Sequence, residues 1–239
     1  MKNFVPFFFL LFSINLLAQQ DTLSFDNFYL TVKNNELKVF SNNNRMIYQK
    51  KFISPNPYTS DLNDDGADEY LVLDSTINNN IPWYILYIYN TKDKFSLIDS
   101  IISGPTEPYE TTSSDLGGTI IVSGNTDFEQ FNNGNENYFI PINCWRYEDS
   151  VIYLVNDEIY NIFINENESI INYLDDYFND NPKNCKASND LKAPIAAAYA
   201  NYMNAGEKSV ASQFLKNYYL CEDLEQFKQK LNELIKRSE

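Results

Sequence analysis

The chain has no histidine among its 239 residues. This absence excludes the Ser-His-Asp and Cys-His nucleophile systems, and it removes the commonest protein ligand of zinc. No other catalytic motif is recognisable in the sequence. The sequence therefore favours a protein that is not an enzyme, and it indicates no catalytic residue and no organic cofactor.

Basic residues are also scarce, since 18 Lys and Arg stand against 33 Asp and Glu, which gives a formal net charge of −15. Nucleic acids and anionic membrane surfaces repel a chain of this charge. We therefore expect neither as a partner. The hydrophobic content of 44% and the aromatic content of 15% are too high for a disordered chain, so a folded core is expected.

The sequence lacks an apolar segment long enough to span a membrane. Residues 4–17 are almost continuously apolar, but a spanning helix needs roughly 20 such residues. Lys2 precedes this stretch and Ala18 follows it, which is typical of a secretory signal peptide covering residues 1–19. We expect export to the periplasm or the extracellular space, with no stable membrane anchor after cleavage.

Only three cysteines are present, Cys144, Cys185 and Cys221, and their spacing matches no metal-site pattern. An exported protein can keep disulfides, and three cysteines leave one unpaired. Cys185 and Cys221 flank the helices expected near the C-terminus, so they are the better candidate pair. Cys144 lies beside Trp145 in an alternating strand and is expected to be a buried apolar side chain.

Residues 20–165 are predicted to form a β-rich domain. Short runs of β-branched and aromatic residues alternate there with Asn, Asp, Gly and Pro, which indicates antiparallel meanders, either propeller-blade-like or a sandwich. The last three expected strands are residues 138–147, 151–154 and 158–164. Asp61 and Asp115, 54 residues apart, each precede a similar series of strands, and fewer than three units of that length fit. The alternative is that there is no true internal repeat, because any β meander shows strands and turns at about this spacing.

Residues 166–239 are predicted to form a C-terminal α-helical region. Ser169 is expected to cap the first helix, Pro194 to open the second and Gly206 to end it, with further helices beginning near Glu207 and Leu224. These helices carry more apolar surface than they can hide among themselves, so we expect them to pack on the β-rich domain. A tethered unit, joined by the polar residues 179–189, is the alternative.

The motif with the clearest chemistry is the loop at residues 61–69. Calcium needs six to eight oxygen ligands, and a loop can supply them from alternate positions. The expected metal ligands are the side chains of Asp61, Asn63, Asp65 and Glu69 and the carbonyl of Ala67. Gly66, expected at positive φ, permits the sharp turn that brings them together. An EF-hand would require Glu where Val72 stands, so the loop is expected to lead into a strand.

Residues 61–72 resemble the calcium turn of FG-GAP/VCBS-type repeats, the blades of integrin-α-like β-propellers. The resemblance implies the same five ligand positions and a blade-like sheet around them. The second unit departs from the pattern, since its loop after Asp115 is short and has no other carboxylate before Thr119. The competing interpretation is an Asp- and Asn-rich turn that binds no ion.

These observations predict an exported, calcium-stabilised β-rich protein that binds a protein or glycan partner of unknown identity. One alternative is an acidic carboxylate-based hydrolase or an enzyme inhibitor of the cell envelope. Glu107, Glu110 and Asp115, in a Pro- and Thr-rich stretch, would be its candidates, because paired carboxylates can cleave glycosidic bonds. Another alternative is a structural envelope protein without a ligand.

Overall fold

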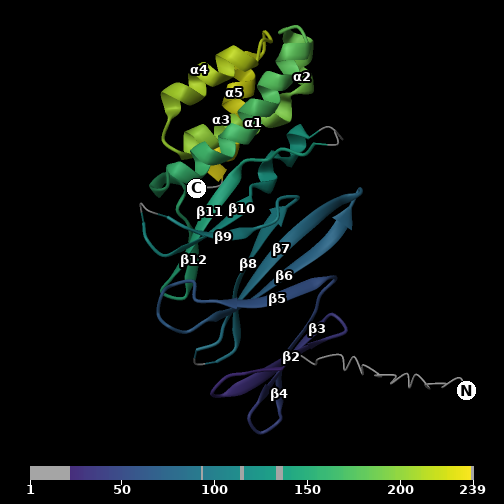
Figure 1. Ribbon diagram of the computed structural model, residues 1–239, viewed down its shortest axis with the longest axis vertical. Coiled ribbons are helices and arrows are strands. Elements are labelled where there is room, and N and C mark those ends of the chain that lie inside the picture. Colours follow the sequence, from purple (N-terminus) through teal and green to yellow (C-terminus); the bar gives the residue numbers. More distant parts are fainter. Residues whose placement is uncertain (1–21, 93, 114–115, 133–136, 238–239) are drawn as a thin grey trace, which may run out of the picture.

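The computed structural model describes residues 22–92, 94–113, 116–132 and 137–237. The predicted signal peptide, residues 1–19, and Asp115 lie outside the described residues. The described part consists of antiparallel sheets followed by a C-terminal group of helices (Figure 1). The predicted fold class, mainly β with a C-terminal helical region, is confirmed.

Twelve described strands form three sheets of four, and each sheet is an antiparallel meander in chain order. The first sheet contains β1 (Thr22–Ser24), β2 (Phe28–Lys33), β3 (Glu36–Ser41) and β4 (Met46–Lys51). The second sheet contains β5 (Pro55–Ser60), β6 (Glu69–Asn78), β7 (Ile81–Asn90) and β8 (Ser96–Gly104). The third sheet contains β9 (Tyr109–Thr112), β10 (Thr119–Gly124), β11 (Ile142–Glu148) and β12 (Val151–Leu154).

The number of meanders differs from the sequence-based count, which allowed fewer than three. The first sheet completes its four strands within residues 22–51, so the spacing of 54 residues between Asp61 and Asp115 does not hold along the whole chain. Short hairpins make this possible, because Asn34 and Asn35 both adopt positive φ between β2 and β3. The three sheets lie in a row along the long axis of the molecule (Figure 1).

The second sheet is the central layer of this row and is buried on both faces. Along β6, Tyr70 and Val72 pack against the first sheet, whereas Leu71 and Leu73 pack against the third. Alternate side chains of a strand point to opposite faces, so a strand between two layers needs an unbroken apolar run. The sequence Tyr-Leu-Val-Leu at residues 70–73 meets this requirement.

The helical region covers the free face of the third sheet. It contains α1 (Asn161–Asp180), α2 (Cys185–Asp190), α3 (Lys192–Asn204), α4 (Lys208–Tyr218) and α5 (Leu224–Arg237). Phe163 of α1 packs against Val122 and Cys144 of the sheet. Cys144 is a buried free cysteine, as predicted, and Cys185 pairs with Cys221 in a disulfide with a Cα–Cα distance of 4.6 Å.

The strand predicted at residues 158–164 is wrong. A short 3-10 turn, η2 (Asn156–Glu158), is followed there by α1, and Ser169 lies inside that helix with its hydroxyl donating to the carbonyl of Glu166. Phe163, Ile170 and Leu174 are buried along one side of α1. Phe163 packs on the third sheet, whereas Ile170 and Leu174 pack among the other helices. Burial at this helical spacing outweighs the strand preference of the β-branched residues in the segment.

Two other segments also differ from the prediction. The stretch expected as a strand at residues 138–147 forms strand only in β11, and the preceding η1 (Thr126–Phe131) buries Phe131 among the helices. The polar stretch at residues 179–189 contains the first part of α2. Pro194 does lie in the first turn of α3, and α3 ends just before Gly206.

Candidate calcium-binding loop

The candidate loop, residues 61–68, connects β5 to β6 in the second sheet. Its ends are held together because Ser60 and Glu69 are cross-strand partners in the antiparallel ladder. Gly66 has φ +83°, which confirms the predicted positive φ, and Asp64 has φ +58°. Glycine and aspartate both tolerate this left-handed backbone conformation, so the loop can turn sharply between the two strand ends.

Asp61 organises the first half of the loop through both carboxylate oxygens. Its Oδ1 accepts a hydrogen bond from the N–H of Asp65 at 3.1 Å, and its Oδ2 accepts one from the N–H of Gly66 at 2.8 Å. Asn63 Oδ1 accepts from the same Asp65 N–H at 3.2 Å. The structure therefore brings the oxygens at positions one and three of the motif to one point.

Asp65, at position five, binds inside the loop and across to the next turn. Its Oδ1 accepts from the N–H of Ala67 at 2.9 Å, and its Oδ2 forms an ion pair with Lys92 Nζ at 2.9 Å. Lys92, and secondly the Ala67 N–H, hold the pKa of Asp65 below its ordinary value. Lys92 comes from the β7–β8 turn, and the motif itself gives no indication of it.

Glu69, at position nine, is the buried carboxylate of the site, with 4% of the residue exposed. Its Oε2 accepts a hydrogen bond from the N–H of Leu62 at 3.1 Å, and no ion pair to Glu69 occurs among the described residues. Burial raises the pKa of Glu69, the Leu62 N–H opposes this change, and the charges of Asp65 and Asp61 add to it. A cation bound in the loop would therefore stabilise the ionised form of Glu69 in particular.

The donor set fits Ca²⁺ in its chemistry, because every expected ligand is an oxygen. The oxygens of Asp61, Asn63 and Asp65 are occupied by N–H donors and by Lys92. Ala67 takes part through its N–H. Within the part of the chain that the structure describes, no group of three or more His, Cys, Asp or Glu side chains is arranged to hold a metal ion. Binding would require the carboxylates to exchange these partners for the ion.

A hollow of about 400 Å³ lies beside the loop, between the second and third sheets. On one side it is lined by Asn63, Asp65, Glu69, Asn90 and Lys92, and on the other by Tyr147, Glu148, Asp149 and Ser150. The second group forms the β11–β12 turn, where Asp149 and Ser150 have positive φ. The sequence predicts this hairpin, but the stacking of two sheets is what places its carboxylates opposite the loop.

The candidate hydrolase carboxylates do not form a facing pair in the described contacts. Glu110 lies on β9, and its Oε2 accepts a hydrogen bond from Ser60 Oγ at 2.6 Å. Glu107 is exposed in the preceding loop. Asp115 lies outside the described residues. Glu110 thus links the third sheet to the end of β5.

None of the described helices is long and apolar enough to cross a membrane. Comparisons of the chain with protein-family models, with curated proteins and with solved structures find no match.

Proposed function

We propose that this is an exported β-rich binding protein, stabilised by a calcium ion at residues 61–69, whose partner is a protein or a glycan. The observation that carries the proposal is the loop itself, in which alternate oxygen donors surround a glycine at φ +83°. Its resemblance to FG-GAP/VCBS-type calcium turns supports the same ligands. These are Asp61, Asn63, Asp65 and Glu69 with the Ala67 carbonyl.

The charge of the loop supports a cation there. Five carboxylates, those of Asp61, Asp64, Asp65, Asp68 and Glu69, occur within nine residues. Lys92 pairs with Asp65, but its side chain is 57% exposed and it supplies a single charge. A divalent ion would offset more of this repulsion, and it would do so beside the buried Glu69, where screening by water is weakest.

The ion would act mainly on the stack of sheets. The loop belongs to the second sheet, and Glu148 and Asp149 across the hollow belong to the third. An ion bound at the loop attracts these carboxylates as well, directly or through water, and so strengthens the contact between the two sheets. The role proposed for calcium is therefore structural, and it leaves the exposed sheet faces free for a partner.

Export is supported by two separate features. Residues 1–19 have the composition of a signal peptide, and the Cys185–Cys221 disulfide suits an oxidising compartment.

The affinity expected of the loop suits an extracellular calcium site. Such sites commonly bind with dissociation constants of about 10⁻⁴–10⁻³ M, and weak binding of this kind is consistent with a loop whose oxygens already have internal partners.

The test compares thermal unfolding in calcium and in chelator for the wild type, Asp65→Asn and Asp64→Asn. Both variants lose one negative charge, but only Asp65 is an expected ligand. At a calcium concentration about 100 times Kd, binding adds about 2.7 kcal/mol to the free energy of unfolding, so Tm should rise by roughly 5–10 °C. The wild type and Asp64→Asn should show this rise, and Asp65→Asn should not. Equal melting of all three proteins with and without calcium would remove the ion from the proposal.

A further inference from the structure

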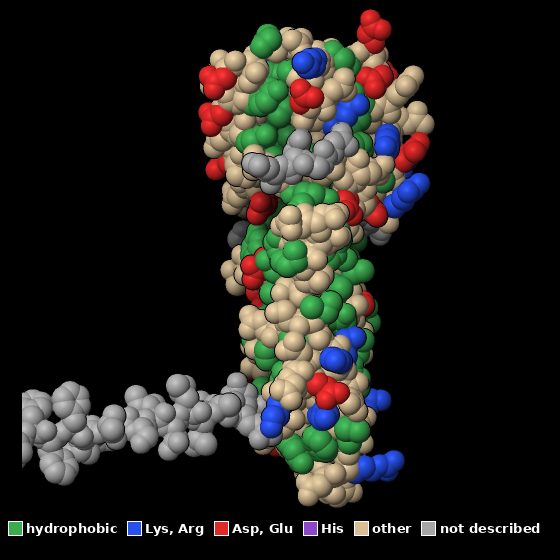
Figure 2. Space-filling model, turned by 90° about the vertical axis from the view of Figure 1, so that its right-hand side faces the viewer, with side chains coloured by type: hydrophobic (Ala, Val, Ile, Leu, Met, Phe, Trp, Pro, Cys, Tyr) green, Lys and Arg blue, Asp and Glu red, His purple; other side chains and the backbone are tan. Residues whose placement is uncertain are grey.

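The first sheet carries positive charge in an otherwise acidic chain. Residues 22–54 contain five Lys or Arg and two Asp or Glu, a net charge of +3. Residues 55–239 contain 12 basic and 30 acidic residues, a net charge of −18. Lys and Arg side chains predominate at the lower end of the molecule, where the first sheet lies (Figure 2). An anionic partner is therefore attracted to this end and repelled by the rest.

One face of the first sheet has no packing partner among the described elements. Leu30, Leu37 and Val39 point to the second sheet, so their neighbours along each strand point away from it. The register arranges these neighbours in three rows across β2, β3 and β4. The rows, here called the outer face, are Lys33–Glu36–Lys51, Thr31–Lys38–Gln49 and Tyr29–Phe40–Met46.

The first two rows form the basic end of the outer face. Lys38 Nζ lies 2.8 Å from Glu36 Oε2, and Gln49 donates to the same carboxylate. Lys33 and Lys51 are exposed on the strands to either side of Glu36. Lys38 pairs with Glu36, and Lys33 and Lys51 flank Glu36 in the register, so three ammonium groups outnumber one carboxylate and leave a surplus of positive charge.

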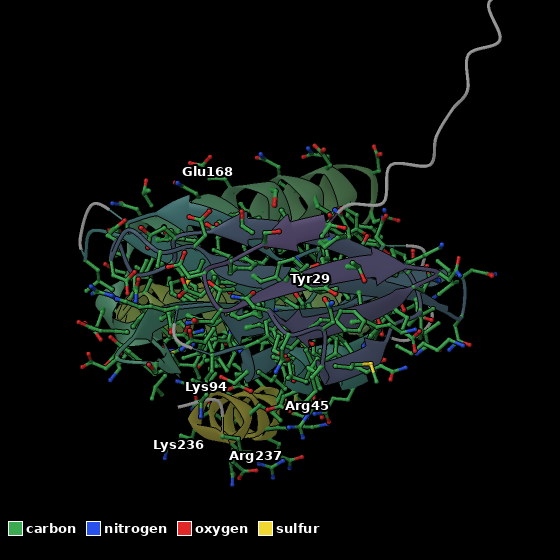
Figure 3. All side chains as sticks on the ribbon, turned by 90° about the horizontal axis from the view of Figure 1, so that it is seen from below. Tyr29, Arg45, Lys94, Glu168, Lys236 and Arg237 are labelled. Carbon is green, nitrogen blue, oxygen red and sulfur yellow. A yellow bond between two sulfur atoms is a disulfide. The ribbon has the colours of Figure 1, made fainter. Side chains whose placement is uncertain are left out.

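The third row supplies an aromatic platform at the other end. The rings of Tyr29 and Phe40 are stacked, with centroids 5.2 Å apart and an interplanar angle of 18°. Tyr29 OH donates to Asn44 Oδ1 at 3.1 Å, which fixes the ring's orientation. Figure 3, which views the molecule from below, shows Tyr29 near the middle of the view and Arg45 nearer its edge. The pair offers apolar surface with a polar group at its edge.

We propose that the outer face binds a polysaccharide that carries carboxylate groups, an inference that rests on the binding role proposed above and names its surface and ligand class. The chain of sugars would lie along the strands. One ring would pack on Tyr29 and Phe40, and carboxylates of the following sugars would pair with Lys33, Lys38 and Lys51. Charge-assisted hydrogen bonds of this kind are stronger than neutral ones.

A folded protein fits this face less well than such a polysaccharide. The centre of a protein–protein interface is depleted in charged residues, and lysine is among the residues found there less often. On the outer face, lysines occupy two of the three rows, and the central row has Lys38 at its middle. A hydrated polyanion can satisfy these charges without burying them, so its binding avoids the cost of desolvating unpaired ammonium groups.

The experiment measures binding of fluorescently labelled polygalacturonate oligosaccharides to the mature full-length protein by anisotropy. It is done in chelator, because Ca²⁺ itself binds carboxylated polysaccharides. Lys38→Gln/Lys51→Gln removes two charges from the outer face. Lys208→Gln/Lys216→Gln removes two exposed charges from α4 and serves as the matched control. We expect about tenfold weaker binding for the first variant, less than a twofold change for the second, and weaker binding at higher salt.

Several results would overturn the inference. The inference fails if the protein does not bind polygalacturonate, or if both double variants lose the same affinity for it. It also fails if neutral dextran binds as tightly as polygalacturonate, or if single-stranded DNA or an acidic protein binds more tightly. Asp65→Asn, which alters the calcium loop of the second sheet, should bind polygalacturonate as the wild type does. If the protein does not bind polygalacturonate but its Tm rises in calcium, only the glycan inference is refuted. If it binds polygalacturonate but its Tm does not rise in calcium, only the calcium proposal is refuted.

Discussion

Asn201, on α3, accepts a hydrogen bond at its Oδ1 from the backbone N–H of Ile142, the first residue of β11, at 3.1 Å. Its Nδ2 donates to Asn167 Oδ1 on α1, and Asn167 Nδ2 donates in turn to the carbonyl of Ala198. Asn167 and Asn201 are each only 1% exposed. A buried, mutually satisfied chain of amides therefore ties the third sheet to two helices.

Asn201→Ala should lower the free energy of unfolding by about 2–3 kcal/mol. The change leaves the Ile142 N–H and the Asn167 amide buried without this partner, and an unsatisfied buried polar group is costly. Urea unfolding followed by circular dichroism measures the loss. Asn204→Ala, in the last turn of the same helix, is the control and should change stability by less than about 1 kcal/mol. Equal effects of the two substitutions would mean that the amide chain does not hold the helices to the sheet.

Lys92→Gln should increase the affinity for calcium several-fold. Lys92 pairs with Asp65 in the structure, so the substitution frees an expected ligand and removes a positive charge that would repel the ion. Isothermal titration with Ca²⁺ measures the change. Lys94→Gln removes an exposed charge two residues away and should have little effect. An unchanged or weaker affinity in Lys92→Gln would show that the lysine and the ion do not compete.

Glu69→Gln should make the protein more stable in chelator at neutral pH. The pKa of Glu69 is raised in the folded protein, so the folded state holds its proton more tightly than the unfolded state does. Stability therefore falls as the pH rises from the ordinary value of about 4.5 through the raised pKa. Glu69→Gln lacks this loss, and it should also lack the calcium-dependent rise in Tm. Thermal unfolding between about pH 4 and pH 8, with and without calcium, provides the test. Parallel pH profiles for the two proteins would contradict it.

Reduction of the Cys185–Cys221 disulfide should destabilise the helical region. The bond joins the start of α2 to the segment after α4, 36 residues apart, and a disulfide closing a loop of this size commonly contributes about 2–4 kcal/mol. Alkylation of the denatured, unreduced protein should label one thiol, Cys144, and alkylation after reduction should label three. Three labelled thiols without reduction would exclude the bond. The reductant should not change Tm in Cys185→Ala/Cys221→Ala.

The sequence predicts the inner strands and several edge strands, but it does not predict β5. Residues 69–74 show an apolar run bounded by turns, which identifies β6 from local pattern alone. β5 was not predicted because Pro55 and Pro57 argue against a strand, yet both residues lie on an edge strand, where a missing N–H is tolerated. The start of α1 was not predicted for a different reason, since its helical spacing becomes evident only against the sheet that it covers.

Part of the candidate site can likewise be predicted from local sequence, and part of it cannot. The grouping of Asp61 and Asn63 around one N–H follows from their spacing in the loop, and the sequence is sufficient to predict it. Lys92 and Asp149 come from turns 27 and 84 residues beyond Asp65, and no local pattern connects them to the loop. Their positions follow from the pairing of β7 with β6 and from the packing of the third sheet on the second. Interactions of this kind depend on tertiary structure.

The arrangement of the sheets in a row gives the first sheet fewer neighbours than the other two. The second sheet packs on the first and the third, whereas among the described elements the first sheet packs on the second alone. A structure built from contacts between successive layers can loosen from one end while the remainder stays folded, as arrays of repeats do. The first sheet is one such end, and a ligand that covers its open face would protect it as a further layer would.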